Sequence, residues 1–310
     1  MRNVLLAYHD IGAVCLEELA ATGDQIALVI THEDPIGEQI WFRSVRELAE
    51  RRGIPVIAPP DVNAADVVER VVSLAPDFLF SAMFRQMLKS ALLEAPRRGA
   101  LNLHPSLLPK FRGRAPINWV LVEGETETGV TLHYMVEKAD RGDIVAQRRI
   151  SIADDDTALT LHRKATEASM LMMRETYPLL AAGRAPRIAQ DSAIASYYGR
   201  RTPGDGEIDW NRPAKRIYDL VRAVTHPYPG AFTWHQGRRL FIWWARVADS
   251  PRPLAAGEVE VTRAGEVYVG ARQGALRLER VQPEGSGEST AAEWAAGGGG
   301  RPVAVLGKSQ

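Results

Sequence analysis

The sequence predicts an α/β protein: a doubly wound, mostly parallel Rossmann-like sheet, followed by a small OB-like β-barrel. Three observations lead to this fold class. Short apolar runs alternate with helix-patterned segments through the first half of the chain. A polar, turn-rich segment then interrupts the pattern. Beyond it, short apolar segments recur at regular spacing, which is typical of a small barrel or sandwich.

Apolar runs in the first half predict strands, and the segments between them predict helices. The strands are expected at 4–8, 26–31, 55–58, 78–82 and 100–104, and the helices at 12–21, 42–52, 64–74 and 89–94. This alternation is typical of parallel sheets with helices on both faces. Two later strands, 129–135 and 144–150, have a short connection, so we expect at least one antiparallel pair. A helix at 159–181 completes this part.

The change in composition divides the chain into a Rossmann-like domain (1–189), a linker (190–206) and a C-terminal OB-like barrel domain (207–310). In the last of these, a helix at 214–224 precedes strands expected at 231–234, 240–245, 258–261, 267–269 and 276–281. A tryptophan-rich patch at 241–244 is either core or contact surface, so homo-oligomerisation remains open.

The composition excludes several classes of protein. Basic and acidic residues balance at 38 each, so no overall field attracts the chain to nucleic acid or membranes. The single Cys15 excludes an internal disulfide and suits a reducing compartment. No apolar run approaches the roughly 20 residues of a membrane helix, and the N-terminus does not resemble a signal peptide. We therefore expect a cytoplasmic protein without membrane insertion.

Two polar side chains stand at the end of one predicted strand. Asn102 and His104 are two residues apart and so share a face, while Leu101 and Leu103 point to the opposite layer. Pro105 ends the strand. Open α/β sheets place their chemistry at the carboxyl ends of strands, so this pair is a candidate active site. The alternative is that both residues are ordinary satisfied polar groups.

The segment after this strand favours the functional interpretation. Residues 106–119 combine two prolines, a glycine and three cations before a helix expected to begin at Pro116. A rigid, basic loop beside a polar strand end is suited to an anionic ligand. The alternative is a solvated loop in which Arg112 and Arg114 have no ligand.

Four motifs connect these segments: Asn-x-His at 102–104, Ser-Leu-Leu-Pro at 106–109, Arg-Gly-x-Ala-Pro at 112–116, and Lys-Ala-Asp-Arg-Gly-Asp at 138–143. Together they resemble the formyltransferase family that uses 10-formyltetrahydrofolate. The runs 6–12, 110–122 and 124–133 are similar to one branch. That branch is the UDP-4-amino-4-deoxy-L-arabinose formyltransferase domain of the bifunctional polymyxin-resistance enzyme, which acts in lipid A modification. The similarity extends from residue 1 to about residue 244.

The resemblance implies a set of site residues. Asn102, His104 and Asp140 would be catalytic; Asp143 is an equal carboxylate on chemistry alone, but Asp140 matches the family's motif. The residues implied to bind 10-formyltetrahydrofolate are Gln86, Met87, Leu88, Arg114, Val136, Glu137, Lys138, Ala139 and Asp140. The acceptor pocket would lie near Tyr8, His9 and Asp10, although His9 is equally suited to capping the loop.

The chemistry that the resemblance implies suits these residue types. Formyl transfer to an amine needs a donor for the developing oxyanion and a group that moves a proton near neutral pH. Asn102 offers an amide N–H, and His104 an imidazole whose charged form a carboxylate such as Asp140 stabilises.

Several alternatives remain. Methionyl-tRNA formyltransferases have a basic loop after the second strand, whereas residues 31–42 are acidic here, so nucleic acid is not the expected partner. A modest basic cluster (Arg200, Arg201, Lys215 and Arg216) could serve a pyrophosphate or simply face solvent. Another UDP- or dTDP-linked amino sugar, a folate deformylase and a non-catalytic folate or nucleotide-sugar binding module also remain open.

Metal and dinucleotide signals are weak. His104, His133, His162 and Asp140 have no compact ligand spacing, so we expect no metal. The dinucleotide-binding and phosphate-binding glycine motifs are absent from the sequence, so we expect formylation alone from this chain.

Overall fold

The chain forms two compact units, each described here by itself. The computed structural model describes residues 1–34, 37, 39–299 and 305–307. Unit 1 comprises Met1–Pro116, Glu127–Ile152 and His162–Gly199; unit 2 comprises Ile117–Thr126, Ala153–Leu161 and Arg200–Gln310. The last change from unit 1 to unit 2, between Gly199 and Arg200, falls inside the segment 190–206, which we propose as the linker.

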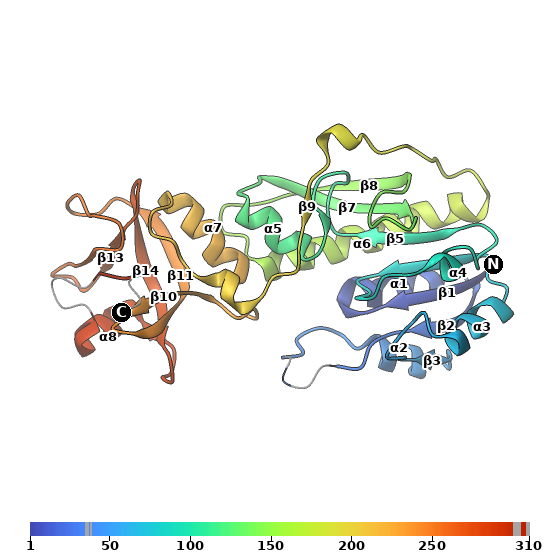
Figure 1. Ribbon diagram of the computed structural model, residues 1–310, viewed down its shortest axis with the longest axis horizontal. Helices are drawn as coiled ribbons and strands as arrows, with labels where there is room; N and C mark the ends of the chain where they lie inside the picture. Colours follow the sequence, from blue (N-terminus) through green and yellow to red (C-terminus); the bar gives the residue numbers. More distant parts are fainter. Residues whose placement is uncertain (35–36, 38, 300–304, 308–310) are drawn as a thin grey trace. The chain divides into compact units, whose positions relative to one another are not determined.

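Unit 1 is built on a seven-stranded sheet with the order β3-β2-β1-β4-β5-β7-β8 (Figure 1). The bounds are β1 (Arg2–Ala7), β2 (Gln25–Ile30), β3 (Val56–Ile57), β4 (Phe78–Ala82), β5 (Ala100–His104), β7 (Glu127–Tyr134) and β8 (Ile144–Ser151). The first five strands pair in parallel, whereas β7 is antiparallel to both β5 and β8. The predicted mostly parallel sheet with a late antiparallel pair is confirmed.

Helices accompany this sheet in the predicted alternation. They are α1 (His9–Ala21), α2 (Val45–Arg51), α3 (Ala65–Ser73), α4 (Ser90–Leu93) and α6 (Ala158–Ala181), whose first residues belong to unit 2. Successive strand residues point to opposite faces of a sheet. Leu5 and Leu6 of β1 are both fully buried, so both faces are covered there, and this explains the continuous apolar runs. None of the helices in the described residues has both the length and the apolar character that crossing a membrane requires.

A second, very small sheet joins distant segments of unit 1. β6 (Arg112–Gly113) pairs in parallel with β9 (Tyr197–Tyr198). Gly113 has φ 97°, and a Cβ there would lie 2.3 Å from the Tyr198 carbonyl oxygen, so only glycine fits. The proposed linker is thus partly ordered, with short 3₁₀ turns at Ser192–Ile194 and Pro203–Gly206 on either side of β9.

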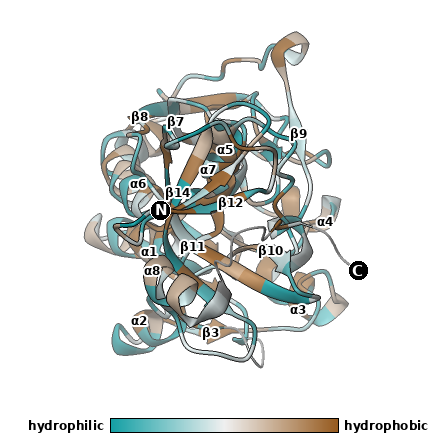
Figure 2. Ribbon diagram, turned by 90° about the vertical axis from the view of Figure 1, so that its left-hand side faces the viewer, coloured by the Kyte–Doolittle hydropathy of each residue, from teal (hydrophilic) through white to brown (hydrophobic). Residues whose placement is uncertain are grey.

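Unit 2 contains a six-stranded antiparallel sheet with the order β10-β11-β14-β13-β12, and β15 pairs with β14. Its strands are β10 (Ala231–His235), β11 (Arg238–Ala248), β12 (Val259–Val261), β13 (Val267–Gly270), β14 (Ala275–Pro283) and β15 (Ser289–Thr290); its helices are α5 (Pro116–Val122), α7 (Ala214–Val224), α8 (Ala291–Trp294) and η3 (Ala295–Gly299). Figure 2 shows hydrophilic and hydrophobic stretches along β11. Leu240, Ile242 and Trp243 are buried there, so much of the tryptophan-rich patch is core. The predicted fold class is confirmed.

A buried ion pair in α7 leads to a stability prediction. Asp219 and Arg222 are almost inaccessible to solvent, and the Arg222 Nε donates to Asp219 Oδ1 at 2.8 Å. We expect Asp219→Ala to lower the free energy of unfolding by about 3–5 kcal/mol, because the buried guanidinium loses its counter-charge. Urea denaturation measures this, with the exposed Asp249→Ala as control. A loss for Asp219→Ala no larger than that of the control would contradict the prediction.

Candidate active site

Asn102 and His104 lie at the carboxyl end of β5, as the strand pattern predicts. The antiparallel pairing of β5 with β7 places Asn102 directly opposite His133, so both side chains share one face of the sheet. His104 is only 5% exposed. The imidazole therefore faces the protein interior rather than bulk solvent.

Asp140 is held at the same place by the loop that follows β7. Its backbone is left-handed, with φ 55°, which is unusual for a residue other than glycine. The Gly113 amide donates to Asp140 Oδ2 at 2.8 Å. The Gln190 Nε2 donates to the carbonyl oxygens of Asp140 and Gly142 at 2.9 and 2.7 Å, which fixes the turn.

The structure brings Asn102, His104 and Asp140 together and adds His133. Asp140 Oδ1 lies 3.5 Å from Asn102 Nδ2, and 3.6 Å from both His104 Nδ1 and His133 Nε2. Burial acts to raise the pKa of Asp140. The charged forms of the His104 and His133 rings, together with a hydrogen bond from the Gly113 amide, outweigh this effect and hold that pKa well below its ordinary value. The carboxylate is therefore charged throughout the neutral pH range.

The neighbouring carbonyl groups indicate where the protons of the two imidazoles lie. His104 Nε2 is 2.8 Å from the Phe111 carbonyl oxygen, which can only accept, so this nitrogen donates. Its Nδ1 is left facing Asp140. His133 Nδ1 likewise donates to the Tyr134 carbonyl oxygen at 2.7 Å, so its Nε2 accepts from Asn102 Nδ2 at 3.2 Å.

This arrangement places a hydrogen-bond donor and a proton acceptor next to each other. The Asn102 Nδ2 donates to Asp140 Oδ1 at 3.5 Å, a long and therefore weak hydrogen bond that this N–H can exchange for one to a substrate oxygen. His104 Nδ1 can take a proton while a carboxylate stabilises the resulting charge. A donor beside a proton acceptor is what acyl transfer to an amine requires.

The residues predicted to bind folate lie in two segments that meet in unit 1. Ser90, which begins α4 just after the 86–88 turn, donates to the Glu137 carboxylate of the second segment. Met87 and Val136 are 54% and 46% exposed, whereas Leu88 is buried in the apolar core. Gln86 is used structurally, because its Oε1 accepts from the Val62 amide at 2.8 Å.

The other predicted residues of this set lie close by. The exposed Arg114 donates through Nη2 to the Arg85 carbonyl oxygen at 2.8 Å, just before the 86–88 turn. Ala139 offers its carbonyl oxygen to the Tyr197 hydroxyl at 3.4 Å. Lys138 is exposed.

Sequence reasoning missed three residues that organise the site. His133 has the alternating pattern of an ordinary strand residue, so only the pairing register reveals its contact with Asn102. Gln190 lies in the segment taken as linker. Arg112, which the sequence leaves open as a solvated cation, is 1% exposed and donates to Gln190 Oε1 through Nε and Nη2 at 3.1 and 2.6 Å.

Two histidines and an aspartate that are far apart in the sequence or lack a motif spacing lie close together in the fold. Sequence spacing offers no compact ligand motif, yet folding places one ligand atom each of His9, Asp10 and His162 within 4.8 Å of one another. This cluster shares no residue with the Asn102–His104–Asp140 group.

Solved structures share this fold at low sequence identity. The N-formyltransferase from Helicobacter canadensis, in complex with folinic acid and dTDP-3-aminofucose, is 19% identical with a TM-score of 0.73, over 91% of this chain and 98% of that one. WlaRD, a sugar 3N-formyl transferase solved with dTDP and 5-N-formyl-THF, is 17% identical with a TM-score of 0.67, over 92% and 98%. HypX from Aquifex aeolicus, in complex with tetrahydrofolic acid, is 18% identical with a TM-score of 0.64. The match covers 95% of this chain but only 47% of HypX, so this chain spans about half of that protein.

Two family profiles match the chain itself. The profile described as formyl transferase matches residues 10–176, and the one described as formyl transferase, C-terminal domain, matches residues 201–299. The first covers more than half of the chain and contains the Asn102–His104–Asp140 cluster. The chain therefore belongs to the formyl transferase family and is an enzyme of that family.

Proposed function

We propose that this enzyme transfers the formyl group of 10-formyltetrahydrofolate to the 4-amino group of a nucleotide-linked amino sugar, with Asn102, His104 and Asp140 as its catalytic residues. One observation carries the proposal. At the carboxyl end of β5, the charged Asp140 carboxylate lies 3.5 Å from the Asn102 amide nitrogen and 3.6 Å from the His104 imidazole Nδ1. That combination suits an oxyanion and a mobile proton in the same step.

The proposed reaction balances without a further reagent. The sugar amine attacks the formyl carbon, and Asn102 Nδ2 donates to the carbonyl oxygen as it gains negative charge. His104 Nδ1 takes the proton that the amine loses. When the bond from the formyl carbon to N10 of the folate breaks, the same proton passes to N10, and the formamide and tetrahydrofolate leave.

The surroundings of the 86–88 turn support a folate at this position. Met87 and Val136 expose apolar surface on the two segments that the Ser90–Glu137 hydrogen bond joins. An aromatic pterin ring is suited to such surface. All three solved relatives described above were crystallised with a folate.

Arg114 gives a binding prediction. Its guanidinium is exposed and suited to pairing with a folate carboxylate. We expect Arg114→Ala to raise the KM for 10-formyltetrahydrofolate about tenfold and to leave kcat within about twofold. Steady-state kinetics measure this, with the exposed Arg163→Ala as control. An unchanged KM in the Arg114 variant would remove this residue from the folate site.

His133 gives a positioning prediction. Its Nε2 accepts from Asn102 Nδ2, so it orients the amide without touching the substrate. We expect His133→Leu to lower kcat about tenfold with little change in KM, because Asn102 loses its acceptor. His133→Gln restores an acceptor and should recover much of that loss. Equal kcat values for the two variants would show that the imidazole does not act through Asn102.

The acceptor is proposed to be UDP-4-amino-4-deoxy-L-arabinose, which would place the enzyme in lipid A modification and polymyxin resistance. Sequence supports this over tRNA, because residues 31–42 contain three acidic residues and no lysine or arginine. Within unit 2, Lys215 and Arg216 are paired with Asp219 and Glu123 at 2.5 and 3.0 Å. These cations are therefore partly neutralised.

Release of tetrahydrofolate from 10-formyltetrahydrofolate tests the proposal directly. We expect fast release with UDP-4-amino-4-deoxy-L-arabinose, slower release with other UDP- or dTDP-linked amino sugars, and none with methionyl-tRNA. Release without any acceptor would indicate a deformylase, and no release with any amino sugar would indicate a binding module. Preference for another sugar would keep formyl transfer and overturn the specificity.

A further inference from the structure

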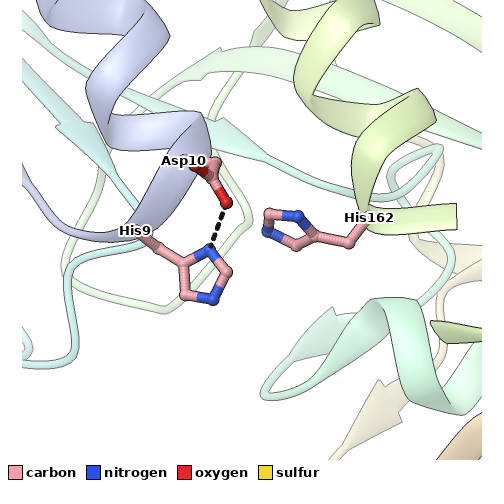
Figure 3. Close-up of side chains that lie close together, drawn as sticks. All are labelled: His9, Asp10 and His162. Atoms are coloured by element: carbon pink, nitrogen blue, oxygen red, sulfur yellow. Dashed lines mark ion pairs between the residues drawn. The ribbon is translucent and has the colours of Figure 1, made fainter. Parts of the chain in front are cut away.

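Three side chains form a cluster outside the proposed catalytic group, where α1 begins. Figure 3 shows His9 and Asp10 at the start of α1 and the ring of His162, from α6, pointing toward them. His9 Nδ1 lies 3.7 Å from Asp10 Oδ2, too far for a hydrogen bond. One ligand atom from each of the three residues lies within 4.8 Å of the others.

Two nitrogen atoms in this cluster have no hydrogen-bond partner. His9 and His162 are 7% and 2% exposed, and His9 Nδ1 and His162 Nε2 are buried without a partner among the described residues. A buried polar atom left without a partner costs about 1–3 kcal/mol. An imidazole nitrogen that makes no hydrogen bond can offer its lone pair to a metal ion.

The neighbouring groups orient the three ligands. Asp10 Oδ1 accepts from the backbone amide and Nε of Arg43, at 3.2 and 3.3 Å, so Oδ2 is free to face His9. The Arg43 guanidinium also donates to the Glu17 carboxylate at 3.0 Å, so one positive charge is shared by the two carboxylates of Asp10 and Glu17. The Thr166 hydroxyl lies 3.5 Å from His162 Nδ1, on the side of the ring away from the proposed ligand atom Nε2.

From this geometry we propose that His9, Asp10 and His162 bind a divalent transition-metal ion such as Zn²⁺. Two imidazole nitrogens and one carboxylate oxygen are a common ligand set for such ions. In a tetrahedral site with bonds of about 2.0–2.1 Å, ligand atoms lie about 3.4 Å apart, so the side chains need to move by about 1 Å. Water fills the remaining position. The proposal departs from the expectation, based on sequence spacing, that the chain binds no metal.

The ion would connect the first turn of α1 to α6 within unit 1. Tyr8, just before His9, donates its amide to the Ala82 carbonyl oxygen at the end of β4, at 3.1 Å. Since β4 lies between β1 and β5, two strand spacings of about 5 Å separate β1 from β5, and the site shares the carboxyl edge of the sheet with Asn102 and His104.

Zinc binding to the purified, untagged chain tests the proposal. After chelator treatment and dialysis, we expect isothermal titration calorimetry to show one Zn²⁺ per chain, and thermal unfolding to show a Tm that rises with Zn²⁺. Asp10→Asn keeps the Arg43 contact but replaces Oδ2 with an amide nitrogen, which cannot coordinate. This variant and His162→Gln should bind Zn²⁺ at least about a hundredfold more weakly and lose the Tm shift.

The control and the Co²⁺-substituted protein separate this site from others. His226→Gln changes an exposed histidine of unit 2 and should bind Zn²⁺ like the wild type. Absorption of the Co²⁺ form should lack a thiolate charge-transfer band, which excludes Cys15 as a ligand. Absence of Zn²⁺ binding by the wild type, or equal binding by wild type, Asp10→Asn and His162→Gln, would overturn the proposal. Formyl transfer is not part of the readout, so the proposed function is tested independently.

Discussion

Replacing His104 with alanine is expected to lower kcat for formyl transfer at least about a hundredfold while the protein remains folded. The imidazole Nδ1 is the atom that we propose accepts the proton of the attacking amine, with Asp140 Oδ1 3.6 Å away to stabilise the charge. Loss of a general base or an oxyanion donor typically costs two to three orders of magnitude in rate. Steady-state kinetics with a fixed amino sugar measure the effect.

The structure also indicates why His104→Ala should fold. His104 Nε2 donates to the Phe111 carbonyl oxygen, and the Ser106 hydroxyl, 3.4 Å from the same oxygen, remains in the variant. Circular dichroism and the affinity for 10-formyltetrahydrofolate should therefore stay close to wild type. His226→Ala, an exposed histidine in unit 2, is the matched control and should keep full activity. A His104→Ala enzyme with most of its turnover would remove this residue from the mechanism.

Elements with strong local patterns could be predicted from the sequence. β4, β5 and α7 have the predicted bounds, because a continuous apolar run or an amphipathic period marks them clearly. β6 and β9 could not be predicted, because two residues carry no period and their pairing depends on the close approach that Gly113 allows. The polar composition of the segment 190–206 predicts a linker but does not reveal that Gln190 supports the Asp140 turn.

The candidate site shows the same limit. Asn102 and His104 could be predicted to share a face from their spacing on one strand, whereas the choice of Asp140 over Asp143 required the family motif. The strand register places His133 at the site, and a loop contact places Gln190 there; neither the register nor the contact can be predicted from a single sequence. The His9–Asp10–His162 cluster was missed because its members come together only when α6 packs in unit 1.

Replacing Asp140 with asparagine is expected to lower kcat by at least about a hundredfold, because the charge beside the His104 imidazole disappears. The amide of the variant would still accept from Gly113 N, so the turn should persist.

Because the pKa of Asp140 lies below its ordinary value, its charge stabilises the folded state above about pH 4, and that contribution is lost as pH falls through the lower folded-state pKa. The variant should therefore be less stable than wild type at pH 7, and the difference should narrow in acid.

Asp143→Asn is the matched control for this change. Asp143 lies three residues further along the same loop, is 42% exposed and faces Arg187 at 3.6 Å, so its charge is screened by solvent. We expect kcat and the stability of the Asp143 variant to stay within about twofold and about 0.5 kcal/mol of wild type. Kinetics together with urea denaturation at pH 7 and at about pH 2 distinguish the two carboxylates. A fully active Asp140→Asn enzyme beside an inactive Asp143→Asn enzyme would reverse the assignment, since only a charge close to His104 can stabilise a proton on Nδ1.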